Sequence, residues 1–269
     1  MTAAKTPQPP VALTIAGSDS GGGAGIQADL KTFAAHDVYG VSALTAVTAQ
    51  NTRGVTDVHL VPAETVAAQL DAVLDDFDVA AAKTGMLGRR ELLELVAERS
   101  LPVLVVDPVL LSTTGASLYE DDPRDYLRIL GPHTALLTPN LPEAAALLGR
   151  PVRGPAAMRD AAKELADHGP RAVLLKGGHV EGEYAVDVFW RDGYCGELAA
   201  PRVDTGNVHG AGCTLSAAVT ANLAAGLPLP EAVAEAKGYI TSALSDAAQW
   251  RLGGGAGPVC HNTKTRRAT

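Results

Sequence analysis

Short apolar runs alternate along the chain with longer stretches in which apolar residues recur at helical spacing. Runs of this length favour strands, and a period of about 3.6 residues favours helices. The predicted strands are residues 11–16, 41–49, 79–83, 103–106, 135–138 and 172–176. The predicted helices are residues 24–36, 62–77, 90–99, 123–130, 142–148, 155–168, 210–225 and 230–247. Because the strands are apolar nearly throughout, the pattern indicates a parallel sheet covered by helices on both faces.

One segment departs from this alternation. Residues 184–190 and 193–199 predict an antiparallel hairpin, with Arg191, Asp192 and Gly193 at its turn. No repeat, low-complexity tract or linker divides the chain. The expected fold is therefore a three-layer α/β domain over residues 11–261, with a mostly parallel central sheet and a small antiparallel hairpin. Residues 1–10 and 262–269 are expected to be flexible ends.

Composition and charge exclude several classes of protein. Hydrophobic residues make up 46% of the 269 residues, enough for a sizeable core. Asp plus Glu number 30 against 22 Lys plus Arg, a net charge of −8, and only 4% of residues are aromatic. This balance argues against nucleic-acid binding, which needs basic and aromatic surfaces. Three scattered cysteines, no apolar leader and no apolar run of about 18 residues predict a cytoplasmic protein without a membrane span.

The candidate chemistry lies where the predicted strands end. In open α/β sheets, ligands bind beyond the carboxyl ends of the strands. Glycine, amide and carboxylate residues follow almost every strand here, at positions 17–25, 50–52, 84–86, 107–109, 139–143 and 177–178. Each group alone could be an ordinary turn. Their convergence on one edge of the sheet predicts a binding site there.

The glycine-rich stretch at residues 17–25 matches none of three well-known motifs. It lacks the Lys-Ser/Thr pair of a Walker loop, and Ile26 replaces the last glycine of a dinucleotide-binding loop. Asp19 occupies the nucleophile position of a GxSxG motif. Two interpretations remain open from the residues alone: a flexible turn before a helix, or a backbone that closely approaches a small ligand.

Residues 205–214 are more informative, because a glycine-rich loop there leads directly into a long predicted helix. Unpaired N–H groups and the helix dipole favour an anion at such a point. Gly210, Ala211 and Gly212 are small enough to let a phosphate approach the backbone. Cys213 falls in the first helical turn, where the dipole is expected to lower the pKa of its thiol.

Several segments taken together resemble a known family. They are residues 16–29 (AGSDSGGGAGIQAD), 48–52 (TAQNT), 83–87 (KTGML), 107–109 (DPV), 138–143 (TPNLPE), 175–179 (LKGGH), 209–217 (HGAGCTLSA) and 257–259 (GPV). In this order they resemble the hydroxymethylpyrimidine/phosphomethylpyrimidine kinases of thiamine biosynthesis, over nearly the whole chain. The resemblance implies a ribokinase-like fold and two successive ATP-dependent phosphorylations of a pyrimidine. It also implies Mg²⁺ with ATP and a homodimer, and it leaves a monovalent cation open as a further cofactor.

Three positions bear on how far the resemblance extends. Ala211 stands where the family usually has Thr, so a hydroxyl contact is lost while the backbone N–H remains. Lys83-Thr84 replaces the more common Lys-Ile. Cys213 stands where most ribokinase-like sugar kinases carry Asp, which points to the pyrimidine branch, although some vitamin B6 kinases share this cysteine.

The resemblance assigns the phosphate-transfer roles to the turn at residues 210–213 and to one lysine. Cys213 is the base that takes the proton of the hydroxymethyl group, and the N–H groups of Gly210, Ala211, Gly212 and Cys213 hold the γ-phosphoryl oxygens. Phosphoryl transfer depends mostly on positioning, so an imperfect base suffices. Lys176 would neutralise phosphate charge.

Two carboxylates are expected to organise magnesium. Asn140 and Glu143 lie three residues apart at a helix start, which alone indicates a helix cap. With the resemblance, Glu143 is assigned to magnesium and Asn140 to ATP phosphate. Asp107 is assigned as a second acidic contact to the metal. His209 is expected to fix its loop rather than to act in catalysis.

The substrate-binding residues are expected on the early strands. Gln50 would pair its amide with a ring nitrogen and the adjacent amine of the pyrimidine, because an amide offers one donor and one acceptor side by side. Met86 and Val109 would be apolar walls, and Gly17 would approach the substrate through its backbone. Asp29, on the first helix, is expected to touch the polar edge of the substrate or the loop.

The sequence therefore predicts a pyrimidine kinase that uses Mg-ATP and small-molecule substrates. A pyridoxal or pyridoxine kinase of the same fold is the nearest alternative, since it also phosphorylates a hydroxymethyl group on a nitrogen ring. A non-catalytic vitamer-binding sensor is a third possibility, against which the glycine-rich turn with Cys213 argues.

Overall fold

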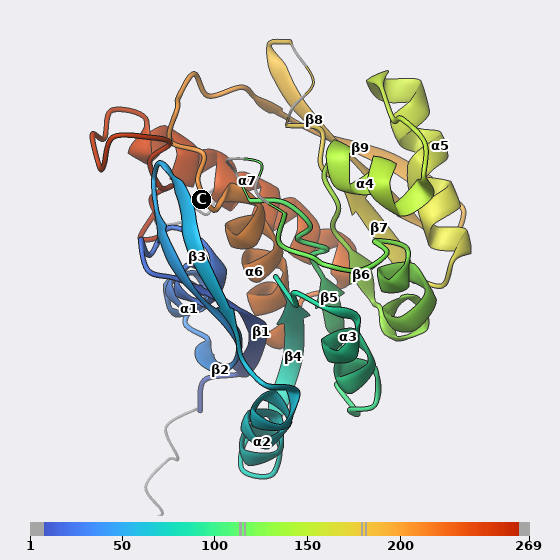
Figure 1. Ribbon diagram of the computed structural model, residues 1–269. Coiled ribbons are helices and arrows are strands. Elements are labelled where there is room, and N and C mark those ends of the chain that lie inside the picture. Colours follow the sequence, from blue (N-terminus) through green and yellow to red (C-terminus); the bar gives the residue numbers. More distant parts are fainter. Residues whose placement is uncertain (1–7, 113–114, 116, 179, 181, 264–269) are drawn as a thin grey trace, which may run out of the picture.

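A single mixed sheet forms the centre of the protein (Figure 1). The computed structural model describes residues 8–112, 115, 117–178, 180 and 182–263. Within these residues the sheet has nine strands in the order β3-β2-β1-β4-β5-β6-β7-β8-β9. They are β1 (Val11–Asp19), β2 (Tyr39–Asn51), β3 (Gly54–Leu60), β4 (Val79–Thr84), β5 (Leu104–Val106), β6 (Leu136–Leu137), β7 (Ala172–Leu175), β8 (Tyr184–Arg191) and β9 (Tyr194–Pro201).

The six strands from β2 to β7 run parallel to one another, and antiparallel strands finish both edges. At one edge β3 pairs with β2, and at the other β8 and β9 form the predicted hairpin. Asp192 and Gly193 both have positive φ, of 50° and 81°, at the turn of this hairpin. Such angles suit the tight turns that match the twist of paired strands.

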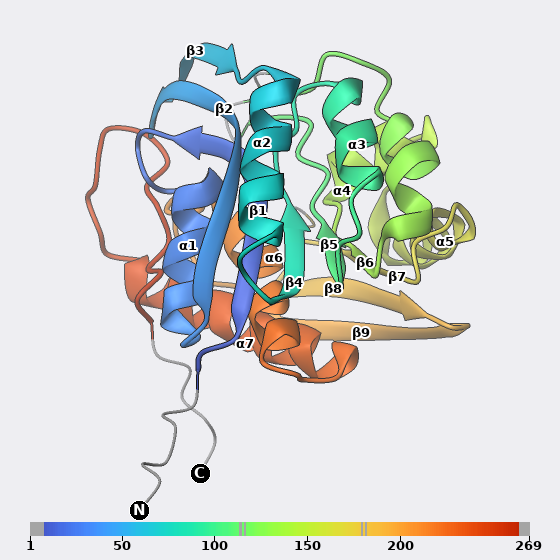
Figure 2. The ribbon, with the colours of Figure 1, turned by 90° about the horizontal axis from the view of Figure 1, so that it is seen from below.

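Helices cover both faces of the sheet, as Figure 2 shows with some helices in front of the strands and others behind them. They are α1 (Gly25–Ala35), α2 (Ala63–Leu74), α3 (Arg90–Ala97), α4 (Leu141–Leu148), α5 (Gly154–Asp167), α6 (Ala211–Ala224) and α7 (Leu229–Ala247), with short helical turns η1 (Tyr126–Leu130) and η2 (Gly131–His133). The apolar side chains of α2, α3, α4 and α5 form one core with the sheet. Those of α1, α6 and α7 pack on the opposite face. The predicted three-layer α/β architecture is therefore confirmed.

Helix α6 lies at the centre of its layer, because it packs against α1, α7 and the strand β4. Its sequence explains this position: Ala217, Ala218 and Ala221 are fully buried and let the neighbouring helices and strands come close. A helix that is buried on almost every side needs such small residues. The loop before α6 is thereby held at the carboxyl edge of the sheet.

The structure corrects the sequence prediction at three places. Strand β3 was not predicted, because residues 54–60 are largely exposed at the sheet edge and carry polar residues between their few apolar ones. The helix predicted over residues 123–130 is the shorter turn η1. Thr263 is buried and donates a hydrogen bond to Asp246, so packed chain extends beyond the predicted boundary at residue 261. Most of the predicted flexible ends lie outside the described residues.

No helix among the described residues combines the length and the apolar character needed to cross a bilayer. This finding agrees with the sequence, in which the long uncharged stretch over residues 210–230 is interrupted by polar residues such as Thr214, Ser216 and Asn222.

The end of β4 contains a buried hydroxyl that forms no hydrogen bond within the described part of the chain, that of Thr84. An unpaired buried hydroxyl costs about 1–3 kcal/mol relative to its bonded state. We predict that Thr84→Val raises the free energy of unfolding by about 1 kcal/mol, measured by urea denaturation with an unchanged m-value. Thr134→Val is the matched control, because that buried hydroxyl donates to the Leu130 carbonyl at 2.7 Å and its loss should destabilise the protein. Equal effects of the two substitutions would contradict the prediction.

Candidate active site

A cavity of about 590 Å³ opens at the carboxyl edge of the parallel strands. Its lining draws on segments far apart in sequence, from the loop after β1 to helix α7. Most of the site residues predicted from sequence line it: Gly17, Gln50, Met86, Asp107, Val109, Asn140, Glu143, Lys176, Gly210, Ala211, Gly212 and Cys213. The fold thus brings these residues to one place, and their individual roles stay predictions.

Asp29 is the exception, and its predicted contact with the substrate is not supported. Its side chain is completely buried, and both carboxylate oxygens accept from the Lys83 ammonium at 2.8 and 2.9 Å. The Thr14 hydroxyl donates to the same carboxylate at 2.6 Å. The Asp29 carboxylate therefore neutralises the charge of the buried Lys83 ammonium. Helical periodicity could not distinguish the inward-facing positions of α1 from those that reach the cavity.

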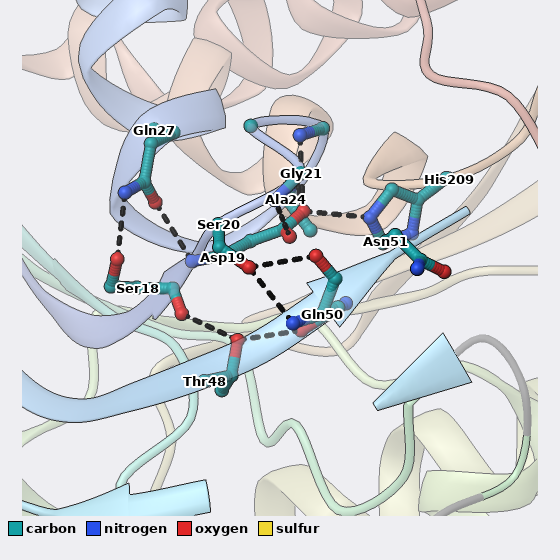
Figure 3. Close-up of polar contacts among 12 residues, drawn as sticks. Ser18, Asp19, Ser20, Gly21, Ala24, Gln27, Thr48, Gln50, Asn51 and His209 are labelled. Atoms are coloured by element: carbon teal, nitrogen blue, oxygen red, sulfur yellow. Dashed lines mark hydrogen bonds and ion pairs between the residues drawn. The ribbon is translucent and has the colours of Figure 1, made fainter. Parts of the chain in front are cut away.

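Asp19 organises the glycine-rich loop after β1 (Figure 3). Its carboxylate accepts from the backbone N–H groups of Gly21, Gly23 and Ala24 at 2.8, 3.0 and 2.8 Å. It also lies 2.7 Å from Nε2 of His209, in the loop before α6. We call this set of contacts the Asp19 clasp. Burial alone would raise the pKa of Asp19, but the hydrogen bonds from His209 and Ala24 outweigh it and hold the pKa below 3.8.

Two glycines allow close backbone approaches here, Gly25 within the first glycine-rich loop and Gly210 between that loop and the one before α6. Gly25 has φ +56°, and a Cβ there would lie 2.3 Å from the Gly17 carbonyl oxygen. Gly210 has φ +77°, and a Cβ there would lie 1.8 Å from the Gly23 carbonyl oxygen. Both the backbone conformation and the space therefore require glycine. The prediction of His209 as a loop-fixing residue agrees with this geometry.

The start of α6 provides the anion-binding geometry expected from the sequence, with one correction. Lys176 points to this helix start, since a Cβ on Gly212 would lie 3.3 Å from its Nζ. The N–H of Ala211, however, donates to the Val208 carbonyl at 3.1 Å and does not face the cavity as expected. The first-turn N–H groups of a helix lack partners within the helix, so Gly212 and Cys213 carry the donors best placed for a phosphate.

The pKa of Cys213 departs from its ordinary value in the direction opposite to the prediction. Burial raises the pKa of this thiol to about 11. The Lys83 ammonium and a hydrogen bond from the Gly25 N–H favour the thiolate, but they offset only part of the rise. Desolvation, to which the nearby Asp29 and Asp107 carboxylates add, therefore decides the direction of the pKa shift, and the thiol is protonated at neutral pH.

Three charged groups lie together at the ends of β5, β6 and β7. The Lys176 ammonium is 2.7 Å from Oδ1 of Asp107 and 4.0 Å from Oε2 of Glu143. Asp107 also accepts from the hydroxyls of Thr138 and Ser216, each at 3.1 Å. Burial raises the pKa of the Glu143 carboxyl to about 7; Lys176 opposes this rise and Asp107 adds to it. Glu143 therefore changes its charge near neutral pH.

Asn140 and Glu143 also form the helix cap that the sequence alone indicates. The Glu143 N–H donates to Oδ1 of Asn140 at 2.9 Å, and the Asn140 N–H donates to Oε2 of Glu143 at 2.7 Å. This capping box starts helix α4. It fixes the Glu143 carboxylate at the cavity wall, so capping and ligand binding are compatible here.

The carboxylates suit a magnesium ion that is held largely by other groups. Among the described residues, no three His, Cys, Asp or Glu side chains are grouped as a metal site. Both oxygens of Asp107 already accept hydrogen bonds, and one oxygen of Glu143 belongs to the capping box. Mg²⁺ commonly takes one or two carboxylates and completes its shell with water and phosphate oxygens. The residues present fit an ion of that kind.

The sequence analysis missed a charged pair on the far side of the cavity. Asp187 of β8 lies 2.7 Å from the Lys237 ammonium of α7 and accepts from the Gly177 N–H at 2.9 Å. Both residues line the cavity. The available signal was an aspartate in the middle of an otherwise apolar strand sequence, AVDVFW. Such a buried charge needs a partner, which only the fold reveals.

The fold and cavity together define a class of protein. A helix start, a lysine and two carboxylates surround the place where a phosphate would lie, and an amide and apolar side chains line the rest of the same cavity. This is the arrangement of a kinase that phosphorylates a small molecule, because phosphoryl transfer needs positioned donors and cations rather than covalent chemistry.

The chain belongs to the phosphomethylpyrimidine kinase family, whose model matches residues 19–260. It is 51% identical to a hydroxymethylpyrimidine/phosphomethylpyrimidine kinase of Rhizobium meliloti over 256 residues, which covers 93% of this chain and 96% of that protein. A solved phosphomethylpyrimidine kinase of Clostridium difficile superposes with a TM-score of 0.76 at 40% identity, covering 87% of this chain and 99% of that one. The pyridoxal kinase of Staphylococcus aureus, solved with AMP-PCP and pyridoxal, superposes with a TM-score of 0.88 at 34% identity, covering 97% and 96%.

The Asp19 clasp predicts a stability effect with a defined pH dependence. Because the pKa of Asp19 is depressed in the folded protein, its contribution is present above the unfolded pKa of 3.8 and is lost as the pH falls through the folded value. Asp19→Asn should lower the free energy of unfolding by about 1–3 kcal/mol at pH 7. The difference from the unsubstituted protein should shrink below about pH 4. Asp76→Asn, at an exposed position, is the control for charge alone. A deficit of Asp19→Asn that stayed constant across this pH range would contradict the role of the clasp.

Proposed function

We propose that the protein transfers the γ-phosphoryl group of ATP to the hydroxymethyl group of 4-amino-5-hydroxymethyl-2-methylpyrimidine, and then phosphorylates the resulting monophosphate, in thiamine biosynthesis. One observation carries this proposal: a single cavity has an amide at one side of the start of α6 and a lysine with carboxylates at the other. The order of strands separates the two sides, since Gln50 follows β2 and Lys176 follows β7.

The ring of the substrate belongs on the side of β1, β2 and β4. Gln50 lines the cavity there with Met86 and Val109, which supply apolar walls for a flat ring. The Met86 carbonyl accepts from the buried Thr45 hydroxyl at 2.6 Å, which fixes the backbone beneath that wall. An amide between apolar walls suits an aminopyrimidine, which needs a donor and an acceptor side by side.

The nucleotide belongs on the side of β7, β8 and α7. Val203, Val208, Ile240 and Leu244 line an apolar part of the cavity there that suits a base. The Asp187–Lys237 pair and Lys176 line the same cavity, and Lys176 points to the start of α6. The AMP-PCP bound by the Staphylococcus aureus relative supports a nucleotide in this class of fold.

In the proposed reaction the hydroxymethyl oxygen attacks the γ-phosphorus, the bond from phosphorus to the bridging oxygen breaks, and ADP leaves. The N–H groups of Gly212 and Cys213 and the Lys176 ammonium stabilise the charge on the transferred group. The hydroxyl proton passes to the Cys213 sulfur. Because the pKa of this thiol is raised to about 11, only a small thiolate fraction serves as base at neutral pH, and the rate must rise with pH.

When bound, Mg²⁺ would neutralise phosphate charge and hold the triphosphate in one geometry. Glu143 and Asp107 are the residues that would hold it, through the free oxygen of Glu143 and through water. The proposal includes a homodimer, which the resemblance supports, and a cytoplasmic location, which the sparse cysteines support, with a monovalent cation as an optional further cofactor.

Pyridoxal phosphorylation is the second candidate, favoured by the similarity to the Staphylococcus aureus pyridoxal kinase. ADP release should be measured with the aminopyrimidine, with its monophosphate and with pyridoxal. Turnover of both pyrimidines with a higher kcat/KM than pyridoxal supports the proposal. A higher kcat/KM for pyridoxal would replace it, and no turnover of any of the three would favour a vitamer-binding sensor.

A first prediction from this mechanism concerns Cys213. Cys213→Ala should lower kcat by ~10²–10⁴, the usual contribution of a general base. The kcat of the unsubstituted protein should rise about tenfold per pH unit from pH 7 to pH 9, because the pKa of the thiol lies near 11. Cys213→Asp should give a flat profile over that range, since a carboxylate is already ionised there. Cys260→Ala is the matched control, because Cys260 does not line the cavity. If kcat of the unsubstituted protein and kcat of Cys213→Asp changed with pH in the same way, Cys213 would not be the group that takes the proton.

A second prediction concerns Glu143. Glu143→Gln keeps an acceptor for the Asn140 N–H, so it removes the charge while preserving the capping box. The magnesium concentration needed for half-maximal activity should rise about tenfold. In the unsubstituted protein this requirement should fall as the pH rises through about 7, where Glu143 loses its proton, and the variant should lack that dependence. Superimposable magnesium titrations would leave Glu143 with a capping role only.

A further inference from the structure

The Thr48 hydroxyl occupies an unusual position between two acceptors at the end of β2. Thr48 is 5% exposed and lines the cavity beside Gln50, two residues further along the same strand. Its Oγ1 lies 2.8 Å from the Ser18 carbonyl oxygen and 3.1 Å from the amide end of Gln50 assigned as Oε1 (Figure 3). The sequence analysis did not single out Thr48.

A hydroxyl has one proton, so Thr48 cannot donate to both oxygens at once. The Ser18 carbonyl is the closer acceptor. The oxygen and nitrogen ends of an amide have nearly the same shape, and the hydrogen-bond network decides which is which. If Nε2 of Gln50 faces Thr48, the hydroxyl donates to Ser18 and accepts from the amide. Both contacts are then satisfied.

Hydrogen bonds hold the backbone on both sides of the contact between Thr48 and Gln50. The backbone of Gln50 is held on both sides by the Ser20 hydroxyl, which accepts from the Gln50 N–H at 2.8 Å and donates to the Gln50 carbonyl at 2.7 Å. Ser18 is held in turn, because the Gln27 amide donates to its hydroxyl at 2.7 Å. The same amide accepts from the Asp19 N–H at 2.9 Å. The acceptor of the Thr48 proton is thus fixed.

We propose that Thr48 is a positioning residue for substrate selection: it holds Nε2 of Gln50 and so turns Oε1 of Gln50 toward a donor on the substrate ring. The inference rests on the proposed function. The second N–H of the amide then meets the ring nitrogen of an aminopyrimidine, and Oε1 accepts from the exocyclic amine. Pyridoxal presents a phenolic oxygen in place of the amine, so its oxygen would face Oε1. Thr48 therefore favours the aminopyrimidine over pyridoxal by fixing the order of donor and acceptor.

The test compares kcat/KM for the aminopyrimidine with kcat/KM for pyridoxal in substituted proteins. Thr48→Val removes the hydroxyl at nearly constant volume and should lower the ratio of the two values about tenfold. Thr48→Ser keeps the hydroxyl and should retain the ratio. The KM for ATP should not change in either. Thr134→Val is the control for losing a buried hydroxyl bonded to a backbone carbonyl far from the cavity.

A double-substitution cycle separates an effect through Gln50 from a general loosening of the loop. Gln50→Leu alone should lower kcat/KM for the pyrimidine ~5- to 150-fold. In that background Thr48→Val should leave the ratio of the two substrates unchanged, because no amide remains to be oriented. Two results would overturn the role of Thr48. One is that Thr48→Val alone leaves the ratio of kcat/KM for the aminopyrimidine to kcat/KM for pyridoxal unchanged. The other is that Thr48→Val lowers this ratio equally in the Gln50→Leu background. A protein with no activity on the aminopyrimidine would instead overturn the proposed function itself.

Discussion

The contact between two glycine-rich loops is the constraint on which the rest of the site depends. Asp19 gathers three backbone N–H groups of its own loop and reaches His209 in the other. The loops then approach so closely that Gly210 could not carry a side chain, because a Cβ there would lie 1.8 Å from the Gly23 carbonyl oxygen. The first loop begins at the strand that lies beside β2 and Gln50, and the second leads into α6 and Cys213. Their contact therefore sets the distance between the Gln50 side and the Cys213 side of the cavity.

Three largely buried lysines have carboxylate partners, two of them in the cavity wall and one, Lys83, fully buried away from it. The pairs are Lys83–Asp29, Lys176–Asp107 and Lys237–Asp187. Burying such charges is costly unless they are paired, and pairing fixes each ammonium group before any ligand arrives. A triphosphate would thus meet cations that need little rearrangement, which is the condition for effective electrostatic stabilisation. The same burial explains why the Cys213 thiol is a weak acid despite its helix start.

The site residues that could be predicted from the sequence are those that stand at the ends of apolar strands. Gln50, Asp107 and Lys176 each follow an apolar strand, so a parallel sheet had to bring them to one edge. Asp29 could not be placed, because its burial depends on how α1 sits against β4 and Lys83. The pKa of Cys213 was misjudged because desolvation depends on the packed surroundings, whereas the dipole can be inferred from sequence. Strand β3 escaped notice because an exposed edge strand carries no continuous apolar run.

The Asp19–His209 contact joins residues that are 190 positions apart in the chain. During synthesis on the ribosome, the strands that carry Asp19 and Gln50 emerge early. The turn at residues 210–213 emerges only after all nine described strands have been made. Until then Asp19 has no histidine partner, and the nascent polypeptide has half of a binding site. A cavity that joins both loops therefore exists only in chains that extend past residue 213, and a ligand bound there would stabilise these molecules rather than shorter ones.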